Sequence, residues 1–375
     1  MARIEFEELE DADPQLGSLA GLLADEVWED VTPLVPRCPG DPVVDIDKDE
    51  STELLFGRFW AVKEAGELSA RVLALTEHII LHVASNEYTV WEWRWRCLCA
   101  GIESARLPAP SDKGSAELAS DKGVETAGRP EACTSPAAPA QAASDTPPPP
   151  PPIRLTPATL AHELALTASV AAFSPKNYQL WNARRKLAFS RGALLTDAEA
   201  DAELAFSEAC LAQDAKNHHA WMHRQAVLAA VWSERVARDE LELTTQLLLD
   251  DDVRNNSVWA QRMFVVRRLV AAEVGVPGAA QPGALLIAGG GPLKEGALEA
   301  DHAVIKREVT MVRDALQSAP SNQAAWNYLW GLRQLVRGAG LDPEIKSLAD
   351  RVRKDAPWAL PAQVILTRLA QATAE

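Results

Sequence analysis

Apolar side chains recur at helical spacing along the chain from residue 52 onwards. One stripe has its members four, three, four and four residues apart: Leu68, Val72, Leu75, Ile79 and Val83. Such spacing places every member on one face of an α-helix. The pattern therefore predicts amphipathic helices that pack by one face against a shared core.

A second pattern, centred on tryptophan, repeats five times: at Trp91, Trp181, Trp221, Trp259 and Trp326. An Asn lies four residues before the Trp in the last four copies, and an Arg lies three residues after it in the first four. In the first copy the Asn, Asn86, lies one place early, and in the fifth copy Leu329 replaces the Arg. The pattern indicates a chain built from repeats.

The repeat has a helical interpretation. Asn is a good helix N-cap, and Trp and Arg three residues apart lie on one helix face. We expect the Trp to wedge between stacked hairpins and the Arg to bond a neighbouring carboxylate or carbonyl. The intervals of 40 and 38 residues after Trp181 and Trp221 hold two helices each. Partner helices are expected over Asp197–Gln213, Asp239–Asp250 and Asp301–Ser318. The predicted fold is all-α, a right-handed α-α superhelix of tetratricopeptide-like helical hairpins.

Two intervals exceed the repeat period, and they set the expected domain boundaries. An acidic, proline-containing arm over 1–50 is expected to be extended unless it docks, and the first helical repeats fill 51–100. A Pro/Ala/Ser-rich insertion over 101–157 is predicted to be disordered. The remaining repeats occupy 158–375, interrupted by a Gly/Pro-rich loop at 275–292.

The overall charge excludes one class of partner. The formal net charge is −16, so a nucleic acid would be repelled, although a local cationic site stays possible. The five cysteines form no disulfide-like framework, no secretory leader is visible, and no run of about 18 apolar residues occurs. We expect a cytoplasmic protein with no transmembrane segment.

No self-contained active site is visible. The sequence has no Gly-rich phosphate loop, nucleophile elbow or zinc box. His78 and His82 are four residues apart, as are His219 and His223, but neither pair has a third ligand at recognisable spacing. No metal site is predicted on this chain, and a structural or surface role is favoured for His78, His82 and His223.

Polar groups gather where successive repeats begin. One turn carries Lys176, Asn177, Tyr178 and Gln179, and the next carries Lys216, Asn217, His218 and His219. Because adjacent repeats stack, these turns should align on one edge of the solenoid. Helix N-termini with Lys and His suit an anion. The alternative is that the Asn residues are caps and the Lys residues are solvated.

The repeats resemble those of protein prenyltransferase α subunits, whose signature reads Pro-x-Asn-Tyr-x-x-Trp-x-x-Arg. Residues 175–184 match it throughout, and the likeness covers about 25–100 and 158–360 apart from the insertions. The segments Asp251–Trp259 and Trp28–Pro33 resemble the farnesyl/type I geranylgeranyl subunit more than the Rab-directed one.

The resemblance implies the α subunit of an obligate heterodimer. A β subunit would hold zinc, which activates the cysteine of a CaaX-ending protein as a thiolate. The thiolate would attack C1 of farnesyl or geranylgeranyl diphosphate, with magnesium expected alongside the diphosphate. The resemblance also implies that this chain lines the rim of the cleft without holding the zinc.

The same resemblance assigns roles at the diphosphate. It places Lys176 against the leaving group as negative charge builds there, which is the expected catalytic contact. Asn217, His218 and His219 are expected nearby in substrate binding. The family commonly has Tyr where this chain has His218, so a hydroxyl contact is absent there.

On the peptide side, the resemblance assigns Gln179 a hydrogen bond to the C-terminal carboxylate of the CaaX peptide. Tyr88 and Tyr178 are expected to line the peptide and diphosphate side of the cleft.

Two other functions stay open at this point. One is the Rab geranylgeranyltransferase α subunit, which would need an escort protein for Rab. The other is a non-enzymatic helical-repeat scaffold. A tetratricopeptide scaffold repeats about every 34 residues, which the intervals of 38 and 40 residues disfavour.

Overall fold

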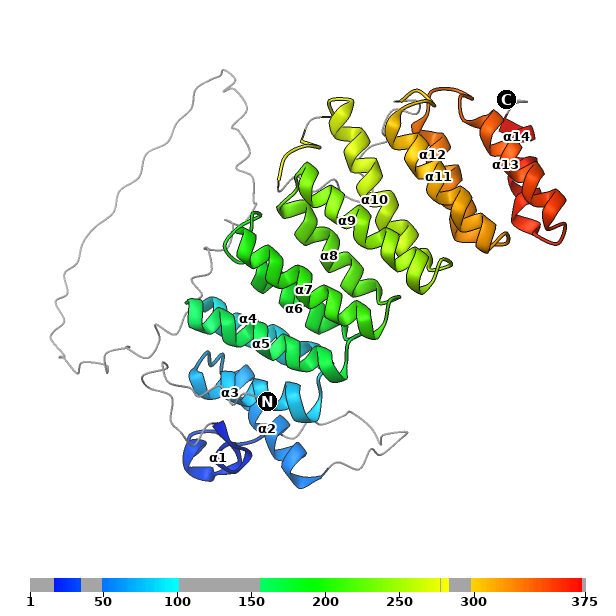
Figure 1. The fold of residues 1–375 in the computed structure, drawn as a ribbon. Helices are drawn as coiled ribbons and strands as arrows, with labels where there is room; N and C mark the ends of the chain where they lie inside the picture. The colour runs from blue at the N-terminus through cyan, green and yellow to red at the C-terminus, as the bar shows by residue number, and fades with distance from the viewer. Residues whose placement is uncertain (1–16, 35–48, 101–155, 277, 283–297, 373–375) are drawn as a thin grey trace, which may run out of the picture.

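The computed structural model describes residues 17–34, 49–100, 156–276, 278–282 and 298–372. Within these ranges the chain is a row of antiparallel helix pairs stacked from α1 at one end to α14 at the other (Figure 1). The β pairing in this part of the chain is one isolated bridge, between Leu298 and Val336. The predicted all-α superhelix of hairpins is confirmed. No helix in the described ranges is both long and apolar enough to cross a bilayer.

From α3 onwards, each repeat pairs an odd-numbered helix with the even-numbered helix that follows it. The bounds are α2 (Glu50–Glu64), α3 (Ala70–His78), α4 (Tyr88–Ala100), α5 (Pro157–Phe173), α6 (Tyr178–Ala188), α7 (Asp197–Gln213), α8 (His218–Ala230), α9 (Glu234–Gln246), α10 (Asn256–Glu273), α11 (Ala303–Ser318), α12 (Gln323–Leu335), α13 (Asp342–Asp355) and α14 (Leu360–Ala372). The helices that carry the repeated tryptophan, α4 to α12 in even numbers, pack against one another in order, and α14 continues the series. Their first turns therefore form one edge of the array.

Most expected helix bounds are confirmed, and one is displaced. Helix α7 matches Asp197–Gln213, and α11 starts two residues later than expected. The helix expected over Asp239–Asp250 instead begins at Glu234, because the Ser233 hydroxyl caps it by accepting the Val236 N–H. It ends in a π-helical turn, Leu247–Asp251.

The repeated Asn and Trp side chains tie each turn to the one before it. Asn217 accepts hydrogen bonds from the N–H groups of His219 and Ala220, and its Nδ2 donates to the Pro175 carbonyl at 2.9 Å. That carbonyl also accepts the indole N–H of Trp181 at 2.7 Å. The same pair of bonds recurs at three other carbonyls: Ser85, Ala215 and Val253. The Asn cap therefore fixes both its own helix and the stacking of the repeats.

The repeated arginine forms a buried ladder of ion pairs. Arg184 binds both carboxylate oxygens of Glu203 in the next repeat and donates to the Leu164 carbonyl and the Thr167 hydroxyl in its own. Equivalent pairs are Arg94–Glu163, Arg224–Glu240 and Arg262–Glu308. Both partners that we expected for the arginine, a carboxylate and a carbonyl, are confirmed.

The last repeat replaces the ladder with apolar contacts. Leu329 stands where the other repeats have Arg, and Ile345 stands at the equivalent of the glutamate, 14 residues before the turn residue Ala359. Both side chains are buried in the core. A buried charge without its partner would be costly, so the arginine and the glutamate are lost together.

The described part of the N-terminal arm is docked, which is the condition under which we did not expect it to be extended. Residues 17–34 contain a short helix, α1 (Leu19–Leu23), and a 3₁₀ turn, Asp25–Val27. Trp28 is buried, donates its indole N–H to the Leu22 carbonyl, and packs against the guanidinium groups of Arg58 and Arg71. This part of the arm therefore docks on α2 and α3 of its own chain.

The predicted insertions lie almost entirely outside the described residues. Of 101–157 only the start of α5 is described, with Thr156 as its N-cap. The loop at 275–292 is described at its beginning, where Arg268 donates to the carbonyls of Ala279 and Gln281 at 3.2 and 3.0 Å.

Candidate functional site

The first turns of α4, α6 and α8 present exposed side chains along one edge of the superhelix. Tyr88 and Tyr178 open α4 and α6, and they are 58% and 67% exposed, unlike the buried tryptophans three residues later. At α6 the Asn177 cap and Trp181 face the core, so the residue directly after the cap faces outwards. Helix α4 instead begins after Glu87, whose carboxylate accepts the Thr89 N–H. The turn geometry therefore places a row of exposed polar and aromatic groups at helix N-termini, as expected from the sequence.

Lys176 reaches from the α6 turn to the α8 turn. Its Nζ lies 2.9 Å from Asp214 Oδ2, and its side chain is 73% exposed. Asp214 Oδ1 accepts the backbone N–H of Lys216 at 3.0 Å. The hydrogen bond from Lys176, together with this backbone bond, lowers the pKa of Asp214. The two charges face solvent at the edge where an anion would approach.

Aromatic rings bridge the same two turns. The ring centroids of Tyr178 and His219 are 5.6 Å apart and meet edge to face, and His218 lies 5.9 Å from His219. Burial lowers the pKa of His219, and the nearby His218 and Arg185 lower it further. His219 is therefore a neutral donor or acceptor at neutral pH, placed at the N-terminus of α8.

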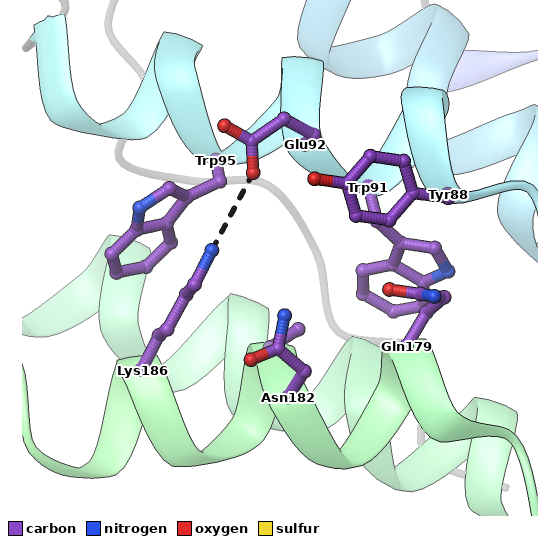
Figure 2. Close-up of a pocket in the computed structure, with 8 residues that line it drawn as sticks. Tyr88, Trp91, Glu92, Trp95, Gln179, Asn182 and Lys186 are labelled. Atoms are coloured by element: carbon purple, nitrogen blue, oxygen red, sulfur yellow. Dashed lines mark ion pairs between the residues drawn. The ribbon is translucent and has the colours of Figure 1, made fainter.

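Gln179 and Tyr88 share a shallow pocket between α4 and α6 (Figure 2). Its remaining wall residues are Trp91, Glu92, Trp95, Asn182, Ala183 and Lys186. Glu92 and Lys186 close its far end with oxygen and nitrogen 3.5 Å apart. Within the described residues, nothing hydrogen-bonds the side-chain amide of Gln179, so that amide is available to a ligand.

Asn217 lies beneath this surface. It is 1% exposed, and the cap bonds and the bond to Pro175 occupy both ends of its amide. The Lys176–Asp214 ion pair and the Tyr178–His219 ring contact both join the α6 turn to the α8 turn. Asn217 holds the turn that carries His219, and a direct contact with substrate stays a prediction.

The other histidines have structural surroundings. His223 is fully buried, and its Nε2 lies 2.7 Å from Glu203 Oε2. The rings of His78 and His82 lie 4.7 Å apart on the first repeat. Among the described residues, no group of three or more His, Cys, Asp or Glu side chains could hold a metal ion.

Sequence reasoning missed Asp214, Glu92 and Lys186. Asp214 had a visible signal, because Asp-x-Lys-Asn at 214–217 recurs as Asp-x-Arg-Asn at 252–255. Glu92 and Lys186 had none, because their proximity depends on how α4 packs against α6.

Comparison with known proteins identifies the repeat. The family described as protein prenyltransferase alpha subunit repeat matches residues 160–190, 200–231, 237–269 and 305–335. These segments coincide with the pairs α5–α6, α7–α8, α9–α10 and α11–α12. The match therefore follows the hairpins of the structure.

Two of the curated relatives that match in sequence represent the two classes of α subunit. The geranylgeranyl transferase type-2 subunit alpha of Saccharomyces cerevisiae is 22% identical over 194 residues, 50% of this chain and 52% of that protein. The protein farnesyltransferase/geranylgeranyltransferase type-1 subunit alpha of Pisum sativum is 45% identical over 67 residues, 18% of this chain and 20% of that protein. The matched segments thus span about half of the first relative and a fifth of the second.

A solved structure shares the fold. The Candida albicans protein geranylgeranyltransferase-I complexed with GGPP includes a chain that superposes with a TM-score of 0.52 at 18% identity, covering 92% of this chain and 98% of that one. Four copies of the protein prenyltransferase alpha subunit repeat thus lie along the observed hairpins, and the solved structure shows that the fold of this chain is shared.

Proposed function

We propose that this chain is the α subunit of a heterodimeric CaaX protein prenyltransferase. The enzyme would transfer farnesyl, geranylgeranyl or both from an isoprenoid diphosphate to the cysteine thiol of a CaaX-ending protein. The observation that carries the proposal is the clustering of Lys176, Tyr178 and His219 at the aligned first turns of α6 and α8. Two helix N-termini and an exposed ammonium form a site suited to a diphosphate.

Each group has a role on this proposal. Zinc held by the β subunit would activate the cysteine of the CaaX protein as a thiolate, and magnesium would accompany the diphosphate. Lys176 meets the negative charge that builds on the leaving diphosphate as the C1–O bond breaks. His219, neutral at the α8 N-terminus, offers a hydrogen bond to the same group. The free amide of Gln179 binds the carboxylate of the peptide, and the exposed rings of Tyr88 and Tyr178 wall the cleft.

The CaaX class rests on local likeness to a type-1 subunit. The Pisum sativum protein reaches 45% identity over its matched segment, twice the 22% of the Saccharomyces cerevisiae type-2 subunit. The type-2 match extends over more residues, 194 against 67, which supports a Rab-directed α subunit as the second candidate. The two differ in substrate, since the Rab-directed enzyme would require an escort protein.

The test compares Lys176→Ala with Lys216→Ala in the heterodimer. Lys216 occupies the same turn position one repeat later, where its ion pair with Asp252 points to the α10 turn, whose first residues include neither Tyr nor His. An interaction formed mainly in the transition state should lower kcat by about 10- to 1,000-fold while ground-state binding of the diphosphate changes little. Lys216→Ala should change kcat less than about threefold, as expected for a solvated surface lysine.

Equal effects of the two substitutions would contradict the assigned role. A loss of diphosphate affinity as large as the loss of rate would also contradict it. Transfer to Rab in the presence of an escort protein, without transfer to CaaX peptides, would select the second candidate.

A further inference from the structure

The carboxylate that faces Lys176 is more firmly held than the lysine itself. Asp214 caps the C-terminus of α7, its backbone N–H donates to the Cys210 carbonyl, and its Oδ1 accepts the Lys216 N–H. Its side chain is 27% exposed, against 73% for Lys176. The carboxylate is therefore the fixed member of the pair, and the lysine is the adjustable one.

The backbone on the lysine side is also fixed. The Pro175 carbonyl accepts two hydrogen bonds, from Trp181 and from Asn217, so the turn before Lys176 is anchored to the α8 turn. Only the torsions of the Lys176 side chain remain free, and a lysine side chain has many rotamers. The contact with Asp214 selects the rotamer of Lys176 that reaches from the α6 turn to the α8 turn. The Tyr178–His219 ring pair joins the same two turns.

The next turn provides a natural comparison. Lys216 Nζ lies 3.6 Å from Asp252 Oδ2, and Asp252 Oδ1 accepts the Arg254 N–H, as Asp214 does for Lys216. The chain positions are equivalent, but the pair is looser and joins the α8 turn to the α10 turn, whereas Lys176 and the Tyr178–His219 rings join the α6 turn to the α8 turn. A purely structural ion pair should behave alike at both turns.

We propose that Asp214 is a positioning residue that holds the Lys176 ammonium where the α6 and α8 turns meet, an inference that rests on the proposed function. Holding the ammonium in place lowers the ordering cost of reaching the transition state. The same carboxylate repels a diphosphate, so it weakens the grip of Lys176 on the substrate before reaction. Asp214 thus favours rate over ground-state affinity.

Asp214→Asn separates these two effects. The amide keeps an oxygen for the Lys216 N–H, so the turn is preserved, but it loses the charge that orients Lys176. The single-turnover rate of the heterodimer should fall about three- to tenfold. The affinity for isoprenoid diphosphate should stay the same or tighten by up to about fivefold, because a like charge has been removed. If Asp214 merely supported the fold, its substitution would lower both the rate and the diphosphate affinity.

The matched set is Asp214→Asn, Lys176→Ala, the double variant, and Asp252→Asn as the control at the equivalent position. In the Lys176→Ala background, Asp214→Asn should have no further effect on the rate, and Asp252→Asn should stay within about twofold of wild type. The inference is overturned if Asp214→Asn slows both backgrounds equally. It is also overturned if Asp252→Asn matches it, or if diphosphate affinity falls with the rate.

A titration of the full chain separates this inference from the proposed function. Hydrogen bonding by Lys176 lowers the pKa of Asp214, so Lys176→Ala should raise that pKa, measured by carboxyl-carbon NMR, more than Lys216→Ala does. A pKa that does not respond to Lys176→Ala in an active heterodimer overturns the positioning role alone. A pKa that responds in a chain that forms no active prenyltransferase overturns the proposed function, and the positioning role with it.

Discussion

The buried ion-pair ladder makes a quantitative prediction at Arg94→Leu. Arg94 and Glu163 are 2% and 3% exposed, and the guanidinium binds both carboxylate oxygens at 2.8 and 2.5 Å. Arg94 also donates to the Leu73 carbonyl at 2.6 Å. Removing the arginine leaves the Glu163 carboxylate buried without a cation, which costs about 3–5 kcal/mol of unfolding free energy.

The double variant Arg94→Leu/Glu163→Leu tests the reason for that cost. With both charges gone, no unpaired ion stays buried, so the double variant should regain about 2 kcal/mol or more relative to Arg94→Leu. The last repeat supports this expectation, because it carries Leu329 and Ile345 at the equivalent positions. Glu77, which also binds Arg94, keeps His162 at 2.8 Å and is partly solvated.

The assay is urea unfolding of the full chain, followed by tryptophan fluorescence and far-UV circular dichroism. Arg235→Ala is the control, because the Arg235–Asp239 pair is exposed at 69% and 58% and should contribute less than about 0.5 kcal/mol. The reasoning is refuted if Arg94→Leu costs no more than this control. It is equally refuted if the double variant is less stable than the single one.

Two further predictions concern a buried histidine and the peptide pocket. Burial lowers the pKa of His223, and no described residue hydrogen-bonds its Nδ1. The stability contribution of neutral His223 is therefore present above about pH 6.5 and is lost as the pH falls below it. Gln261 occupies the equivalent position in the next repeat, so His223→Gln removes the titrating group with a side chain that the fold accepts. The substitution should reduce the loss of unfolding free energy between about pH 7 and 5 by up to about 1.4 kcal/mol per pH unit, and an unchanged pH dependence would contradict this. Gln179→Ala removes a hydrogen bond to a carboxylate that is worth about 1.5–3 kcal/mol, so KM for a CaaX peptide should rise about 10- to 150-fold while diphosphate affinity stays unchanged. Asn182→Ala, in the same pocket, is the control. If peptide KM and diphosphate affinity change together, Gln179 supports the fold rather than the peptide.

The repeats were predictable because one physical unit is written several times. An Asn helix cap, a Trp that packs between hairpins and an Arg at fixed spacing specify a helical hairpin. The repetition of this pattern at Trp181, Trp221 and Trp259 specifies that the hairpins stack. The partners of the ladder were predictable in kind but not in identity. Glu203 and Glu308 lie 19 and 46 residues from their arginines, a difference set by the lengths of the intervening turns.

The edge of the superhelix was only partly predictable. Lys176 and Gln179 were found from the motif of their own turn, whereas Asp214 belongs to the next repeat and becomes relevant only when the turns stack. The docking of Trp28 was also missed, because it depends on Arg58 and Arg71, which lie far from it in sequence. Local sequence patterns therefore predicted the helices and their caps, whereas packing between repeats determined which side chains pair.

Transfer of a labelled prenyl group to a CaaX peptide tests whether this chain is the α subunit of a CaaX prenyltransferase. The chain would be purified with the subunit that accompanies it, and each subunit would also be assayed alone. We expect transfer by the pair, no transfer by this chain alone, and loss of transfer when the cysteine of the peptide is replaced by serine. Transfer by this chain without a partner, or a stable pair that prenylates no CaaX peptide with either farnesyl or geranylgeranyl diphosphate, would contradict it.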